Sequence, residues 1–109
     1  ISGIIQCIQK ERNIKIHLVF MFLVIICGFL FQLSITEWLV CILLFGLVIS
    51  LELVNTAIEA VVDLCTQEYH PLAKIAKDTA AGAVLISAIA SVVIGLIIFV
   101  PKILSLVSL

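Results

Sequence analysis

Residues 38–64 read WLVCILLFGLVISLELVNTAIEAVVDL, and this stretch decides the fold. It is apolar up to residue 51 and then carries polar side chains at helical spacing. Two further apolar stretches flank it, at about 14–33 and 79–100. Each reaches the ~20 residues that a helix needs to cross a bilayer. We therefore expect an all-α integral membrane protein with three transmembrane helices, at about 14–33, 37–64 and 79–100.

The composition agrees with a membrane protein. The chain has 109 residues, of which 64% are hydrophobic and 12% are charged, and its mean hydropathy is +1.41. A soluble domain of this size needs more polar surface than these charged side chains supply, so an ordinary soluble protein is excluded. The length allows one domain, residues 1–109. A net charge of −1 with only six basic residues excludes a nucleic-acid partner.

Two shorter segments connect to the first span. Ser34 and Thr36 are candidate N-caps in a short connection, so the first two helices are expected to form an antiparallel hairpin. Residues 1–12 are expected to form an amphipathic helix on the membrane surface, because isoleucines recur there at helical spacing while polar residues occupy the other faces. These isoleucines are Ile1, Ile4, Ile5 and Ile8.

The basic residues predict the orientation in the membrane. Five of the six lie before the first span or between the second and third, and one follows the third; they are Lys10, Arg12, Lys15, Lys74 and Lys77 against Lys102. Because basic residues accumulate on the cytoplasmic side, the N-terminus and the 65–78 loop are expected in the cytoplasm of a multi-pass plasma-membrane protein.

The second span carries a stripe of polar residues. Glu52, Asn55, Glu59 and Asp63 are spaced i, i+3, i+7 and i+11. At 3.6 residues per turn all four lie on one helical face. Three acids at a membrane helix end are costly unless the stripe meets a cation, water or a polar partner. The stripe therefore indicates a functional site.

Counting from the turn of the hairpin suggests how this site is built. Glu11 and Glu59 lie at nearly the same depth on the cytoplasmic side, and Glu52 lies ~10 Å deeper in the bilayer. Two level carboxylates can hold a divalent cation, and magnesium suits so few carboxylates because it takes further oxygens from phosphates. No GxxxxGK[ST] motif is present, so a nucleotide site must be of another kind. Nearby candidates to contact a nucleotide are Glu68, Tyr69, His70, Lys77 and Asp78.

Four segments together carry a resemblance to a known family. Residues 52–63 read ELVNTAIEAVVD, 68–70 read EYH and 76–78 read AKD, and this pattern resembles the small prokaryotic diacylglycerol kinase family. Residues 11–17 read ERNIKIH, which is similar to the Gram-positive branch, whose members are undecaprenol kinases. The resemblance covers nearly the whole chain.

The resemblance implies a homotrimer that phosphorylates a membrane lipid alcohol with ATP and Mg²⁺. It implies that Glu52 is the catalytic base and that Glu11 and Glu59 hold the magnesium and contact ATP. Asn55 and Asp63 lie in the same motif in a supporting role. Further ATP contacts are implied for Glu68, Tyr69, His70, Lys77 and Asp78. Lipid-substrate contacts are implied for Asn13, Ile14, Lys15, Ile16 and His17.

Three alternatives to an undecaprenol kinase stay open at this point. Diacylglycerol also presents one hydroxyl at the membrane interface, so a diacylglycerol kinase fits the same spacing. A small proton-coupled transporter subunit would use acids in a membrane bundle as a relay, but would place them near the middle of the bilayer. A purely structural assembly factor gives no reason for an acidic stripe.

Overall fold

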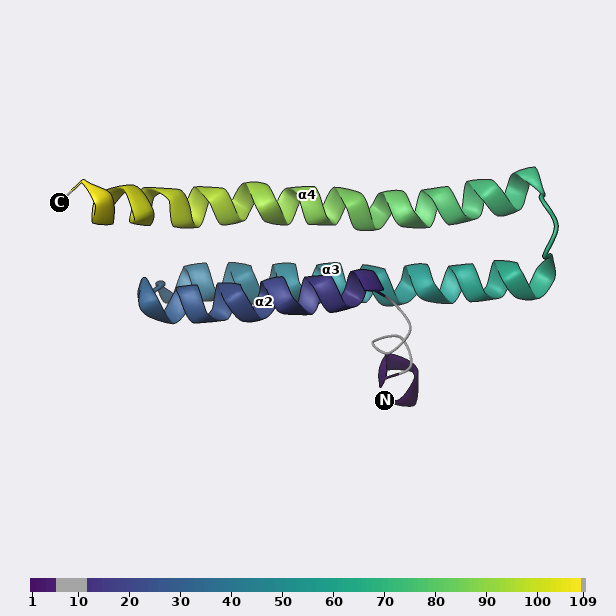
Figure 1. Cartoon of the computed structure of the whole chain (residues 1–109), viewed down its shortest axis with the longest axis horizontal. Helices are drawn as coiled ribbons and strands as arrows, with labels where there is room; N and C mark the ends of the chain where they lie inside the picture. Colours follow the sequence, from purple (N-terminus) through teal and green to yellow (C-terminus); the bar gives the residue numbers. More distant parts are fainter. Residues whose placement is uncertain (6–11, 109) are drawn as a thin grey trace.

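The computed structural model describes residues 1–5 and 12–108, with side chains described from Ile14 onward in the second range. Within these ranges the chain is helical and contains no strand, which confirms the all-α class. Its long helices are α2 (Arg12–Leu30), α3 (Ile35–Cys65) and α4 (Pro71–Val107). Figure 1 shows the three running lengthwise beside one another, with α3 in the opposite sense to α2 and α4.

A tight turn ends α2. Gln32 adopts left-handed backbone with φ of 55°, and the Leu33 amide then donates to the Gly28 carbonyl at 3.1 Å. This is the hydrogen bond that closes a helix C-terminus when the chain reverses. The first helix therefore ends at Leu30 rather than at about residue 33 as the apolar run predicted.

A capping box starts α3. The Glu37 amide donates to Ser34 Oγ at 3.2 Å, and the Ser34 amide donates to Glu37 Oε1 at 2.9 Å. Both backbone groups would otherwise lack partners in the first turn of a helix. The expected cap at Ser34 and the antiparallel hairpin are confirmed.

The indole ring of Trp38 holds the hairpin closed. It packs against the Phe29 ring, with centroids 5.0 Å apart, and covers Gly28. A Cβ placed on Gly28 would lie 2.5 Å from Trp38 Cη2, closer than side chains pack. Glycine is therefore required at this position because the ring rests directly on the α2 backbone.

Both α2 and α4 pack against α3, which is the central helix. The buried apolar residues are few, namely Ile14, Leu33, Cys41, Val48, Ala80 and Val84. Many other large apolar side chains are exposed, among them Leu43 at 73% and Leu64 at 87%. A water-soluble monomer does not leave this much apolar surface uncovered. The surface is suited to lipid or to further copies of the chain.

Within the described residues, two helices are long and apolar enough to cross a membrane, α3 and α4. The apolar part of α2, Ile14–Leu30, is shorter. Together with their exposed apolar surface, α3 and α4 place the protein in the membrane. A crossing by α2 as the third span stays a prediction.

The two longer helices are longer than a bilayer is thick. At ~1.5 Å per residue, the 31 residues of α3 and 37 of α4 measure about 46 and 55 Å, against a hydrocarbon thickness of about 30 Å. At the end near the hairpin, Lys102 Nζ pairs with Glu37 Oε2 at 3.1 Å. Glu59 lies about 33 Å along α3 from Glu37, a distance close to the hydrocarbon thickness.

The helix α4 extends beyond the predicted third span at both ends, and the span itself stays a prediction. The 65–78 segment is not a loop: only residues 66–70 connect the helices, and α4 begins at Pro71, eight residues before the predicted start. Proline suits the first helical position because its missing N–H needs no partner there. The helix also continues through Pro101 to Val107 instead of ending near residue 100. Proline keeps a helical φ, and membrane helices tolerate the lost hydrogen bond.

The predicted surface helix is described in part. Residues 2–5 are helical and expose Ile4 and Ile5, each at 48%. Residues 6–11 lie outside the described ranges, so the helix over 1–12 stays a prediction.

A glycine-to-alanine pair tests the packing at the hairpin. Gly28→Ala should destabilise the protein by about 1–3 kcal/mol, because the new methyl group collides with the Trp38 ring. Gly46→Ala is the matched control: it also lies within a helix, and nothing stands within 4 Å of its added Cβ. Unfolding in mixed detergent micelles measures both. Equal stability of the two variants would contradict the close contact.

Candidate functional site

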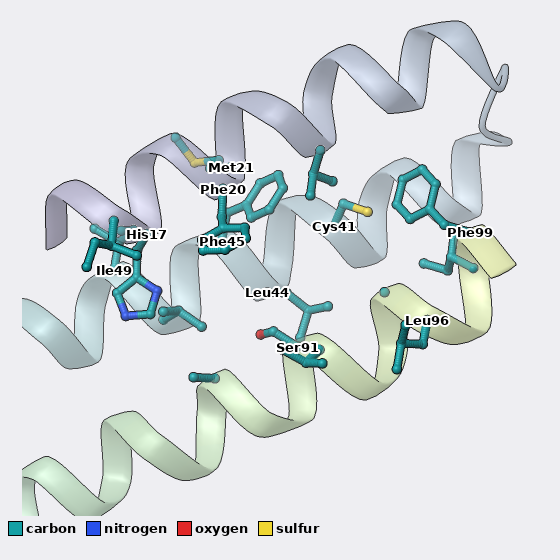
Figure 2. A pocket seen from close by; sticks show the side chains of 17 residues that line it. His17, Phe20, Met21, Cys41, Leu44, Phe45, Ile49, Ser91, Leu96 and Phe99 are labelled. Carbon is teal, nitrogen blue, oxygen red and sulfur yellow. The ribbon is translucent and has the colours of Figure 1, made fainter. Parts of the chain in front are cut away.

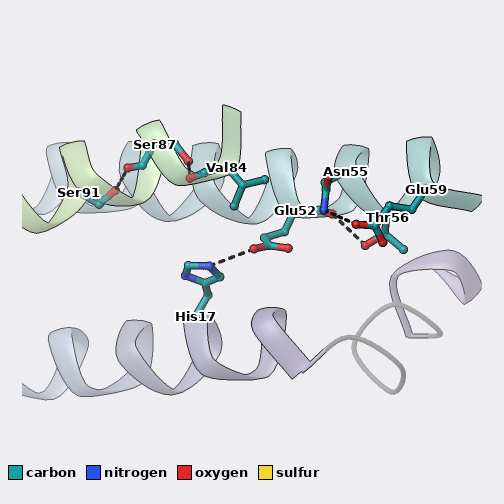
Figure 3. Close-up of polar contacts among 8 residues, drawn as sticks. All are labelled: His17, Glu52, Asn55, Thr56, Glu59, Val84, Ser87 and Ser91. Atoms are coloured by element: carbon teal, nitrogen blue, oxygen red, sulfur yellow. Dashed lines mark hydrogen bonds and ion pairs between the residues drawn. The ribbon is translucent and has the colours of Figure 1, made fainter. Parts of the chain in front are cut away.

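A buried carboxylate and a histidine meet between α2 and α3. Glu52 is 2% exposed, and its Oε1 lies 3.1 Å from Nε2 of His17 (Figure 3). His17 reaches it from the second turn of α2, and its side chain is 24% exposed. Within the described part of the chain, this is the only hydrogen bond between side chains of α2 and α3.

The next residues of the stripe follow one turn and two turns later on α3. Asn55 is 8% exposed, and its Nδ2 donates to Glu59 Oε1 at 3.1 Å. Asn55 Oδ1 is buried and has no hydrogen-bond partner among the described residues. Thr56 Oγ1 donates to the Glu52 carbonyl at 3.0 Å. The stripe thus contains one free buried oxygen beside a carboxylate.

The loop after α3 is shaped by its own side chains. Thr66 Oγ1 exchanges hydrogen bonds with the Glu68 backbone, at 3.2 Å to both its amide and its carbonyl. His70 caps α4, because its Nδ1 accepts from the Leu72 amide at 3.1 Å. Tyr69 stands between them and is 79% exposed. The three predicted nucleotide contacts of this loop are therefore held on a short, structured connection.

Ion pairs join the loop-proximal ends of α3 and α4. Lys77 Nζ lies 2.6 Å from Asp63 Oδ1, which ties the first turns of α4 to the last turns of α3. Lys74 pairs with Asp78 within α4. All four side chains are at least 41% exposed, so they remain accessible from the aqueous side.

The structure places the predicted site residues in two regions, one on α3, the loop and the start of α4, and the other at the start of α2. The end of α3, the loop and the start of α4 lie at one end of the molecule, the right side of Figure 1, whereas Glu52 lies near the middle of α3. Of the predicted lipid contacts, Ile14 is 1% exposed and belongs to the core, while Lys15 and Ile16 are exposed. Glu11 and the side chain of Asn13 lie outside the described residues.

The contact between His17 and Glu52 was missed, although the sequence held a signal for it. His17 precedes Ser34 by 17 residues, and Glu52 follows Ile35 by 17 residues. In an antiparallel hairpin such residues lie at the same depth. The same count predicts that Glu11 and Glu59 are level, whereas His17 is predicted only to contact the lipid.

The oxygens of Asn55 and Glu59, one and two turns after Glu52, are of the kind that magnesium binds. Glu59 offers a carboxylate and Asn55 a free buried carbonyl oxygen, and Mg²⁺ prefers such ligands. Within the described residues, no group of three or more histidine, cysteine or acidic side chains could hold a metal by itself. The donors present therefore suit an ion that takes its remaining ligands from phosphate and water.

An apolar cavity borders His17, the partner of the buried carboxylate. It has a volume of about 450 Å³, lies between α2, α3 and α4, and contains His17 in its wall (Figure 2). Phe20, Phe45 and Leu96 are among the side chains that line it. The cavity is nearly free of polar surface, so it offers space for hydrocarbon rather than for a nucleotide.

Comparison with known proteins gives a consistent result. The family model for prokaryotic diacylglycerol kinase matches residues 1–99. The chain is 55% identical to a Bacillus subtilis protein named undecaprenol kinase, over 92% of this chain and 81% of that protein. It is 46% identical to a Synechocystis diacylglycerol kinase, over 96% of this chain and 61% of that protein. A Helicobacter pylori diacylglycerol kinase is 39% identical over 78% of this chain and 67% of its own length.

The exposed pair between Lys77 and Asp63 should contribute little to stability. Solvent screens exposed ion pairs, so Lys77→Met and Asp63→Asn are each expected to change the unfolding free energy by less than about 1 kcal/mol. A double-mutant cycle of unfolding in micelles measures the coupling. A coupling of about 3 kcal/mol would show instead that the pair holds α3 and α4 together.

Proposed function

This chain belongs to the prokaryotic diacylglycerol kinase family and is a lipid kinase, and we propose that its substrate is undecaprenol, converted to undecaprenyl phosphate with ATP as the phosphate donor. The identity of 55% to the Bacillus subtilis undecaprenol kinase favours this substrate over diacylglycerol, for whose kinases the identities quoted above are 46% and 39%. Undecaprenol and diacylglycerol present the same hydroxyl chemistry.

The observation that carries the proposal is the place of Glu52. Its carboxylate is buried and is held by His17, whose ring borders an apolar cavity that can take the hydrocarbon of a lipid alcohol. Glu52 is about 22 Å along α3 from Glu37, so it lies inside the hydrocarbon layer and below the charged end of the helices. A lipid alcohol reaches this depth without leaving the membrane.

Glu52 acts as the general base. The lipid hydroxyl gives its proton to the Glu52 carboxylate while its oxygen bonds to the γ-phosphorus of ATP. The bond from that phosphorus to the β–γ bridging oxygen breaks, and ADP leaves with the electron pair. The proton and the phosphoryl group thus move in one displacement, and positioning and charge neutralisation supply the catalysis.

The polar end of α3 and α4 binds the nucleotide. Lys77 is close enough to Asp63 to be oriented by it and exposed enough to meet a phosphate. Glu68, Tyr69, His70 and Asp78 surround the same end and contact the remainder of ATP. Glu59, Asn55 and Glu11 would hold Mg²⁺, and the ion would offset phosphate charge.

The protein works as a homotrimer with three spans per subunit. The uncovered apolar faces of α3 and α4 support self-association. The N-terminus and the 66–70 connection face the cytoplasm, where ATP is available, and α2 crosses the membrane in the opposite sense to α3. Lys15, Ile16 and His17 at the start of α2 lie along the lipid substrate.

Transfer of phosphate from γ-labelled ATP to lipid in mixed micelles tests the function. With Mg²⁺ present we expect label in undecaprenyl phosphate, and label in phosphatidic acid at least ~10-fold lower when diacylglycerol is offered instead. This ratio corresponds to about 1.4 kcal/mol of transition-state preference. Glu52→Gln keeps the side-chain size but removes the base, so kcat should fall by at least about 100-fold.

The outcomes separate the alternatives. Label mainly in phosphatidic acid would make the protein a diacylglycerol kinase. Full activity of Glu52→Gln would remove Glu52 from the base role. No label in either lipid from a full-length, folded protein would overturn the kinase function and favour a transporter.

Two lysines one turn apart test the nucleotide site. Lys77→Met should raise the KM for ATP or lower kcat, by about 10-fold or more in kcat/KM, because one cation opposite the phosphates is lost. Lys74→Met is the matched control, because Lys74 pairs with Asp78 along the same helix and is assigned no substrate contact. Steady-state kinetics with varied ATP measures both. Equal losses in the two variants would point to the overall charge of this end rather than to a phosphate contact.

A further inference from the structure

His17 makes one polar contact within the described part of the chain, and that contact is to Glu52. Nε2 of His17 and Oε1 of Glu52 are 3.1 Å apart, and the Glu52 side chain is only 3% exposed (Figure 3). The imidazole ring also forms part of the wall of the apolar cavity. The histidine therefore lies between the carboxylate and the space where a lipid can enter.

The chemistry of a general base determines which partner donates. An ionised carboxylate only accepts hydrogen bonds, so the contact requires His17 Nε2 to carry the hydrogen. Oε1 is then occupied, and within the described residues Oε2 accepts no hydrogen bond. The ring thereby fixes the rotation of the carboxylate and leaves one oxygen available.

We propose that His17 is a positioning residue that donates through Nε2 to Glu52 Oε1 and so holds Oε2 ready to accept the proton of the lipid hydroxyl. This inference rests on the proposed role of Glu52 as the base. His17 then affects the proton-transfer step, and so kcat, in addition to any contact with the lipid itself.

A proton-relay role for His17 lacks a route. Within the described residues, Nδ1 of His17 has no polar partner, and the cavity that the ring borders is almost entirely apolar. A proton passed from Glu52 to the ring would have no acceptor beyond it. A donor that stays protonated through the reaction fits the surroundings.

Amide variants separate a donor from a relay and from a structural contact. Glutamine places an N–H₂ group near the position of Nε2, asparagine places one near Nδ1, and leucine has no donor. The wild type, His17→Gln, His17→Asn, His17→Leu and Glu52→Gln are compared as full-length proteins in micelles with undecaprenol and Mg-ATP. Val19→Leu is the control, because Val19 is 60% exposed and lies on another face of α2.

The expected result is a graded loss in kcat. His17→Leu and His17→Asn should lower kcat by about 10- to 100-fold, the range for removing a hydrogen bond to a charged group, with the KM for ATP within about twofold of the wild type. His17→Gln should recover most of the activity, to within about threefold of the wild type, because it restores the donor. Val19→Leu should behave as the wild type.

Three results would overturn the inference. His17→Leu with kcat within about threefold of the wild type would show that the donor is not needed. A loss confined to the lipid KM would make His17 a binding contact only. His17→Gln as inactive as His17→Leu would exclude the donor role. Unfolding of each variant in micelles shows whether a loss of activity comes from loss of folding.

The same assay keeps this inference separate from the proposed function. If the wild type transfers no phosphate to lipid, the kinase function fails and the variants need not be compared. If the wild type is active and Glu52→Gln is not, but His17→Leu is fully active, only the role of His17 fails.

Discussion

A carboxylate buried inside a membrane protein needs a hydrogen-bond partner, and the structure depends on how Glu52 obtains one. An isolated charge at this depth is costly, because neither lipid nor the apolar core can replace its water. Its partner, His17, comes from the neighbouring helix. The contact requires α2 to lie against α3 in one register, and the left-handed turn at Gln32 and the Trp38 ring against Gly28 set that register.

A lipid kinase has to bring a lipid from the membrane and ATP from water to one site, and this arrangement of helices offers a suitable surface for each. The cavity beside His17 is apolar and suits hydrocarbon, whereas the ends of α3 and α4 carry exposed charges that suit ATP. Both helices are longer than a bilayer is thick, so a helix that spans it can carry charged residues beyond the hydrocarbon. Under the proposed function, the phosphate of ATP and the lipid hydroxyl meet near the membrane boundary.

Local sequence patterns predict the start of α3 correctly but not the two ends of α4. Ser34 and Glu37 form the expected cap, because a capping box is a local interaction between residues three apart. The start of α4 was placed too late because Lys74, Lys77 and Asp78 were read as a polar loop. Their polar side chains are equally compatible with a helix that has left the membrane. Pro101 lies within α4, because a membrane helix can pass through a proline.

The sequence by itself determined the all-helical class, the membrane and the acidic stripe on one face of α3, because hydropathy and a 3.6-residue period act along the chain. Only the tertiary structure decided which residue meets Glu52, that Asn55 keeps a buried oxygen free, and that Lys77 reaches Asp63. These contacts join different helices or depend on side-chain burial. These contacts depend on how deep each helix lies and how it is rotated against α3. The packing of the connections between the helices sets both the depth and the rotation.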